Sequence, residues 1–417
     1  MTDRAWVPRI GPEHIRPGLL NVVVYGPGEG ESVVLVMPDG HLGVVDGCWH
    51  GVDDPVNEFV GSWLAEKLPR RQPKRMIRFL CLTHPHSDHF GGLALVVAKH
   101  RKRLERVATI QTTIHERAAE WFGSLVEPGP TERHKYNDFK RFILRLREVA
   151  QRGEQFEFHY LTDRRSVFED NGLGFEVFGC APSGTDAFLA ESAGSVGTPG
   201  YDYNTASAAL VVRYGGSGVL LTGDLVGKTK YTNRGWLAAA RHLAGMPLQV
   251  IKAAHHASEE AHCERLWHNR QASVVLVTPF KNARPANGGA GGDQPPTRDD
   301  LVRLAAHTPN LVVTSPPRWL ADTERKTAGL TSLLAPARPD PTIPPVAPTT
   351  AHQHRYNAVL VALDNQGVVH AITLAGQARF YDNNGLPQPL PTTPPVALGV
   401  TPAQGTPAQS NPAQSSP

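Results

Sequence analysis

The segment 83–92 constrains the fold of this chain more than any other stretch. It reads THPHSDHFGG, and four of its side chains, within six residues, can bind metal ions. These side chains are His84, His86, Asp88 and His89. The largely apolar run 76–82 predicts a buried strand before them, and the apolar run 93–98 predicts the start of a helix after them. We therefore expect a tight loop at the carboxyl end of a strand, where open α/β sheets usually place their chemistry.

A second set of candidate ligands follows later apolar runs. The runs 208–214 and 219–222 flank Gly-rich residues and predict a hairpin whose second strand leads to Asp224. The run 248–254 predicts a strand that leads to His255 and His256. Because adjacent residues at a strand end point in opposite directions, one histidine should bind a metal while the other faces the substrate or supports the ligands. The sequence leaves open which one. Imidazoles and carboxylates suit zinc, manganese or iron.

This order of motifs resembles the metallo-β-lactamase superfamily. The resemblance rests on HPHSDH at 84–89, TGD at 222–224 and HHAS at 255–258, and it covers roughly residues 19–314. It is closer to the branch that includes the hydrolase domain of the ComEC DNA-uptake channel, with Ala257 where that branch has glycine. The resemblance implies an α/β (α+β) four-layer αββα sandwich with a two-metal site on its rim.

The resemblance also implies residue roles. One ion would be held by His84, His86 and Asp224, and the other by Asp88, His89, Asp224 and either His255 or His256. Asp88 and Asp224 would be catalytic, with Asp224 bridging the ions. Asp46 and Thr83 would support the ligands, whereas Asn204, Ser207, Lys252 and Ser258 would contact the substrate. For Asp46, Asn204 and Lys252 a purely structural role is the alternative. The chain lacks the histidine that classical lactamases often use before the hairpin, so either Zn²⁺ or Mn²⁺ is expected.

Composition limits the partners and the compartment. The 417 residues include 42 basic and 39 acidic ones, a formal charge of +3, so contact with DNA or RNA would need a local patch. The basic residues within 99–147 either form such a patch or are solvated helix faces. The four cysteines are far apart and form no CxxC pair, which suits a reducing compartment. Because no signal pattern or 18-residue apolar run occurs, we expect a cytoplasmic protein without a membrane segment.

The chain divides into one large domain and appendages. Residues 1–18 form an N-terminal arm or edge segment, and 19–314 form the metallo-β-lactamase-like domain with a helical insert at 94–152. A Pro-rich linker at 315–350 and a hairpin at 351–382 that packs on the core would follow. The tail 383–417 is rich in Pro, Thr, Gln and Ala, and we expect it to be disordered.

The expected function is a two-metal hydrolase that uses a metal-bridging hydroxide, namely a phosphodiesterase or nuclease acting on nucleic acid. One alternative is a hydrolase of a small phosphodiester, a cyclic nucleotide, a thioester or a lactone. The other is a non-catalytic metal-binding partner protein. The sequence does not identify protein partners.

Overall fold

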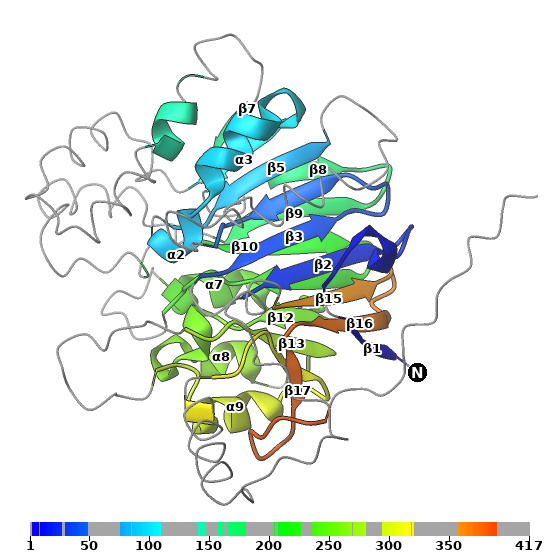
Figure 1. Ribbon diagram of the computed structural model, residues 1–417, viewed down its shortest axis with the longest axis vertical. Coiled ribbons are helices and arrows are strands. Elements are labelled where there is room, and N and C mark those ends of the chain that lie inside the picture. Colours follow the sequence, from blue (N-terminus) through cyan, green and yellow to red (C-terminus); the bar gives the residue numbers. More distant parts are fainter. Residues whose placement is uncertain are drawn as a thin grey trace, which may run out of the picture.

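Two stacked β-sheets with helices on their outer faces make up the computed structural model (Figure 1). The structure describes residues 2–7, 9–26, 30–48, 76–84, 86–109, 141–146, 148, 157–161, 166–180, 204, 207–226, 235–268, 270–280, 294–317, 319–320 and 357–389. The first sheet has the order β1 (Asp3–Val7), β16 (Val369–Ala375), β15 (Ala358–Leu363), β2 (Leu20–Tyr25), β3 (Ser32–Val36), β4 (Leu42–Val45), β5 (Ile77–Leu82), β6 (Arg106–Thr109) and β7 (Glu157–Tyr160).

The second sheet has the order β17 (Arg379–Tyr381), β14 (Leu311–Val313), β13 (Val274–Val277), β12 (Val250–Lys252), β11 (Ser217–Leu221), β10 (Ala209–Tyr214), β9 (Phe175–Cys180) and β8 (Ser166–Asp170). Helix α3 (Leu93–His100) lies on the outer face of the first sheet. Helices α7 (Gly235–Leu243), α8 (Glu264–Trp267) and α9 (Arg298–Ala305) lie on the outer face of the second. The expected four-layer αββα sandwich is confirmed.

Strands in the middle of the two sheets are covered on both faces, so their sequences are apolar at nearly every position. In β2 all six residues are buried, because one side of the strand faces the other sheet and the opposite side faces the helical layer. Val22 and Val24 belong to the core between the sheets, whereas Val23 and Tyr25 belong to the core under α3. A third core lies between the second sheet and helices α7, α8 and α9.

The expected helical insert at 94–152 is wrong at residues 106–109, whereas residues 94–100 lie in a helix as expected. Helix α3 ends at His100 and is followed by strand β6, which pairs in parallel with β5 and β7. Three of the four β6 residues are buried, so tertiary pairing decides the conformation of a segment too short to show a period of its own. The helix expected at 54–68 and most of the insert after residue 110 lie outside the described residues.

The C-terminal strands belong to both sheets. Strand β15 pairs with β2, and β16 pairs with β15 and with β1, so β1 is an edge strand of the first sheet. Strand β17 pairs with β14 in the second sheet. Residues 383–389, expected as the start of the tail, are ordered: Gln388 N–H donates to Phe380 O at 2.7 Å. Most of 315–350 and residues after 389 lie outside the described residues. Within the described chain, no helix is long and apolar enough to span a membrane.

Candidate metal centre

The predicted ligands lie together at one edge of the two sheets. His84 follows β5, whose parallel neighbour β4 is followed by Asp46. Asp224 follows β11, whose parallel neighbour β12 is followed by the pair His255 and His256. Because parallel strands end on the same side of a sheet, residues distant in sequence reach one site.

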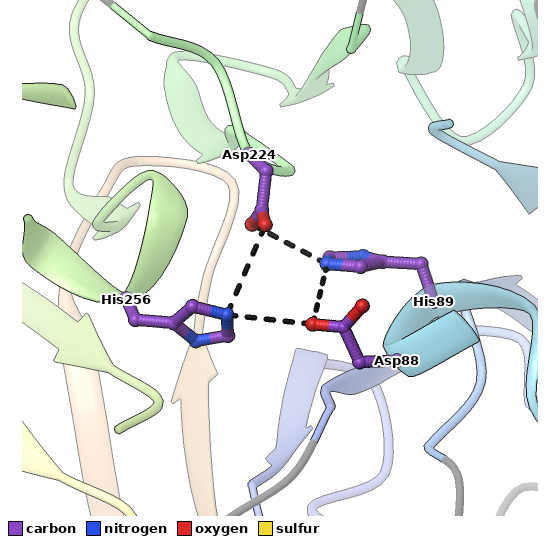
Figure 2. A group of neighbouring side chains, drawn as sticks. All are labelled: Asp88, His89, Asp224 and His256. Carbon is purple, nitrogen blue, oxygen red and sulfur yellow. Dashed lines mark ion pairs between the residues drawn. The ribbon is translucent and has the colours of Figure 1, made fainter. Parts of the chain in front are cut away.

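One donor group consists of the side chains of Asp88, His89, Asp224 and His256, whose ligand atoms all lie within 4.8 Å of one another. Figure 2 shows these side chains pointing toward a common centre. His89 Nε2 lies 3.3 Å from Asp224 Oδ1 and 3.7 Å from Asp88 Oδ2. His256 Nε2 lies 3.5 Å from Asp88 Oδ2 and 3.8 Å from Asp224 Oδ2. Two imidazoles and two carboxylates thus surround one position.

A second donor group shares one residue with the first. His84, His86 and Asp224 also place ligand atoms within 4.8 Å of one another. His84 Nε2 lies 3.9 Å from Asp224 Oδ2 and 3.1 Å from His86 Nδ1. Asp224 Oδ1 faces His89, and Asp224 Oδ2 faces both His84 and His256, so this carboxylate lies between the two groups.

Buried polar atoms indicate that this site is built for cations. His89 Nε2 and Asp224 Oδ1 are inaccessible to solvent and have no hydrogen-bond partner within the described chain. Leaving such atoms unsatisfied is costly, whereas a shared cation would satisfy both. Nitrogen and carboxylate donors in these proportions suit Zn²⁺ or Mn²⁺. The residues present therefore fit a pair of divalent ions.

Mutual electrostatics set the charge states of the donors. Burial would raise the pKa of Asp224, but His89 and His256 outweigh burial and hold this pKa well below its usual range. Burial lowers the pKa of His84, and the neighbouring His89 lowers it further. Asp224 is therefore anionic and His84 neutral, which are the forms that bind metal ions. Burial would lower the pKa of His89, but the carboxylates of Asp224, Asp88 and Asp46 outweigh burial and raise it well above its usual range, so a cation would replace a proton on this ring.

Asp46 orients the loop that carries the ligands. Its carboxylate accepts hydrogen bonds from Thr83 N at 2.8 Å and from Thr83 Oγ1 at 2.7 Å. It also lies 2.8 Å from His89 Nδ1. Donation of the Nδ1 proton to Asp46 leaves Nε2 of His89 free to bind a metal. The structure thus places Asp46 and Thr83 behind the ligands, as the resemblance implied.

The structure separates the roles of the paired histidines. His256 belongs to the first donor group, and its Nδ1 lies 2.8 Å from Thr278 O. His255 instead lies 3.1 Å from Asn204 Nδ2 and 3.1 Å from Ser258 Oγ. Both histidines have positive φ, 44° and 56°, in a turn that the sequence pattern did not reveal. Backbone strain of this kind is concentrated at functional sites.

Two predicted substrate contacts are corrected. Ser207 is 0% exposed, accepts a hydrogen bond from Asp224 N at 3.0 Å and lies 3.3 Å from His84 Nδ1, so it supports ligands instead of facing substrate. Lys252 is also 0% exposed and forms an ion pair with Glu31, which sequence reasoning missed. Glu31 follows the Gly-rich segment 26–30 of the sequence and carries no local signal of its distant partner.

The basic residues that follow α3 do not face the metal centre. Leu104 bridges to Ile77 at the first residue of β5, and Glu105 N donates to Ile77 O at 2.9 Å. The metal loop follows the other end of β5, roughly 15–20 Å away for a strand of this length. Residues 99–106, the first part of the basic segment, therefore provide no track beside the site.

The family of the chain follows from comparison with known proteins. Residues 60–315 match the model of the metallo-β-lactamase superfamily, and the chain belongs to that family. The superfamily comprises metal-dependent hydrolases, and the candidate metal centre lies within the matched region. No curated protein gives a significant match.

Solved structures similar to this chain include Igni18, a metallo hydrolase from Ignicoccus hospitalis. It is 12% identical over 64% of this chain and 84% of that chain, with a TM-score of 0.32. A metallo-β-lactamase HARLDQ-motif mutant from Cronobacter sakazakii is 14% identical over 62% and 76% of the two chains, with a TM-score of 0.30. The hydrolase AbOPH is 14% identical over 50% and 69%, with a TM-score of 0.28.

Proposed function

We propose that this protein is a two-metal phosphodiesterase. The observation that carries the proposal is the position of Asp224, whose two carboxylate oxygens serve two adjacent groups of buried ligands. One group would hold an ion through His84 and His86, and the other through Asp88, His89 and His256. When bound, a pair of Zn²⁺ or Mn²⁺ ions supplies an activated water and neutralises negative charge on the substrate.

Residues at the mouth of the site would handle substrate and water. The Asp88 side chain is 17% exposed, whereas that of Asp224 is 3% exposed, so Asp88 is the carboxylate placed to orient an attacking water. His255 is partly exposed, and Asn204 and Ser258 fix the orientation of its ring. We place His255 beside the substrate as a residue that orders Asn204 and Ser258, because both of its ring nitrogens already have these partners.

DNA and RNA are the first substrates to test, because the motifs resemble the ComEC-like branch of the superfamily. The basic segment 99–106 does not add to this argument, since it follows the far end of β5. The same two ions could also hydrolyse other substrates. The alternatives are a small phosphodiester, a cyclic nucleotide, a thioester and a lactone. A non-catalytic metal-binding protein is the remaining alternative.

The test is a panel of hydrolysis assays with added Mn²⁺ or Zn²⁺. It comprises single- and double-stranded DNA, RNA, a cyclic nucleotide, bis-p-nitrophenyl phosphate, a thioester and a lactone. We expect cleavage of at least one phosphodiester by the wild-type protein and none by a His86→Ala/Asp88→Ala variant. Turnover confined to the thioester or lactone would refute the phosphodiesterase. No turnover, with less than one ion per chain, would favour the binding protein.

A further inference from the structure

A buried polar cluster lies beside the candidate metal centre and has no part in the chemistry proposed above. The side chains of Lys252 and Glu31 are 1% and 3% exposed and form a direct ion pair. Lys252 ends β12 in the second sheet, whereas Glu31 precedes β3 in the first. Thr278, which follows β13, donates its hydroxyl hydrogen to Glu31 Oε2 at 2.7 Å. The three side chains therefore join the two sheets at the edge where the metal ligands lie.

Each member of the cluster also bonds to a metal ligand or to its immediate neighbour. The bonds are Glu31 N–H to Asp88 O at 3.1 Å, Lys252 Nζ to Gly223 O at 3.3 Å, and His256 Nδ1–H to Thr278 O at 2.8 Å. Gly223 immediately precedes Asp224. Three of the four residues in the first donor group, Asp88, Asp224 and His256, are thus held directly or through a neighbour by one cluster.

Gly30, which lies just before the first sheet's strand β3, also packs closely against the main chain of Asp88. A Cβ atom at Gly30 would lie 2.4 Å from Asp88 O, nearer than any real contact of this kind. The main chain at 30–31 therefore lies directly against Asp88, and a shift of this segment toward the metal loop would displace the Asp88 main chain.

A stabilising role alone is a poor explanation for this ion pair. Removing two charges from water costs so much that apolar residues of similar volume often stabilise a core as well or better. The donors in the first group must instead keep fixed positions around one ion, and partners behind metal ligands commonly set the affinity.

We propose that Glu31, Lys252 and Thr278 act together as positioning residues for the ion held by Asp88, His89, Asp224 and His256. They fix the Asp88 main chain, the turn before Asp224 and the ring of His256, and they touch neither the substrate nor the ion. The inference rests on the two-metal function proposed above, but it concerns metal affinity and not the substrate.

The test is calorimetric titration of metal-free full-length protein with Zn²⁺ and with Mn²⁺, together with thermal unfolding. The variants are Lys252→Met, Glu31→Gln and the double variant, which leaves no unpaired charge. The control is Arg78→Met, which also removes an ion pair. Arg78 Nη1 lies 2.7 Å from Glu105 Oε2, near the start of β5 and away from the metal loop. Each single variant should bind the ion held by Asp88, His89 and His256 about 10–100-fold more weakly, and the other ion should be weakened less, because it shares only Asp224 with the first.

The double variant separates positioning from stability. We expect the Tm of the double variant to return most of the way to the wild-type value. Its affinity for the ion in the first donor group should stay as low as in the single variants. Arg78→Met should lower Tm and leave both affinities unchanged. Wild-type affinity for both ions in the double variant would overturn the inference, as would affinity losses that follow Tm in every variant. A wild type that binds two ions but cleaves no phosphodiester would refute only the proposed activity. A wild type that binds fewer than two ions would overturn both proposals.

Discussion

At the scale of single residues, Asp224 determines whether one ion or two can be held. It is the one residue common to both principal donor groups among the described residues, and its pKa lies well below the usual range because His89 and His256 face it. An ionised carboxylate between two cations offsets their mutual repulsion. The amide of an asparagine has nearly the same shape but lacks this charge.

The Asp224→Asn variant should bind at most one ion per chain and lose at least about 100-fold in hydrolysis, the scale on which even partners of metal ligands act. Metal analysis after dialysis and the assay panel measure both effects. The matched control is Asp364→Asn, which changes a carboxylate in the turn between β15 and β16. Retention of two ions in Asp224→Asn would contradict a bridging role.

Asp46 should act on metal binding without contact to the ions. Replacement by alanine removes the acceptor of the Thr83 N–H and of the His89 ring, at a cost of about 1–3 kcal/mol for each buried donor left unpaired. Metal affinity should fall about 10–100-fold because the His89 ring loses its orientation. Calorimetry and urea unfolding measure the two quantities. Unchanged affinity together with lost stability would show that Asp46 is only structural.

Residue-level prediction from sequence succeeded where one short pattern holds the information. The loop ligands at 84–89 occupy six positions after one strand, so the pattern alone indicates their chemistry. The choice between His255 and His256 depends on two positive φ angles that the sequence does not show. The role of Lys252 depends on Glu31, a partner in the other sheet. Such pairings are decided by tertiary structure and have no local pattern.

At the scale of elements, the site depends on the close packing of loops that follow parallel strands. Strand β6 shows the limit of periodicity: it is only four residues long and lies inside the segment 94–152, for which the sequence predicts helix. The longer runs at β2, β5 and β10 were recognisable, since each keeps nearly all of its residues buried.

The Gly30→Ala variant tests the close contact between Gly30 and the metal loop. Gly30 has a φ of +76°, and an added Cβ would meet Asp88 O at 2.4 Å. Gly40 has a φ of +90°, but a Cβ added there would meet no atom within 4 Å. The Gly40→Ala variant therefore has the backbone strain without a steric clash, and it is the matched control. Both variants should lose about 1 kcal/mol from the strained backbone. Only Gly30→Ala should also lose metal affinity, as measured by calorimetry. Equal affinities in the two variants would mean that Asp88 tolerates the displacement.

At the scale of the whole molecule, the C-terminal strands complete the sheets that hold the site. Strands β15 and β16 lie between β1 and β2 in the first sheet, and β17 borders β14 in the second. The core between the sheets therefore includes side chains far from the metal motifs in sequence. Family motifs identify the centre of such a fold, but they do not show which later segments close its edges.

A chain that ends at residue 356 should not fold, although it keeps every candidate metal ligand. The truncation removes six large apolar side chains of β15 and β16 that are 0% exposed, namely Val359, Leu360, Val361, Leu363, Ile372 and Leu374. Burial of each contributes about 1.5–3 kcal/mol, so their combined loss is comparable with the whole net stability of a domain, about 5–15 kcal/mol. It also exposes the edge of β2, which favours aggregation. A chain that ends at Pro389 keeps every described strand and is the matched control. Circular dichroism and size-exclusion chromatography compare the two. A soluble, cooperatively folded 1–356 chain would show that the metal-binding region is stable without the C-terminal strands.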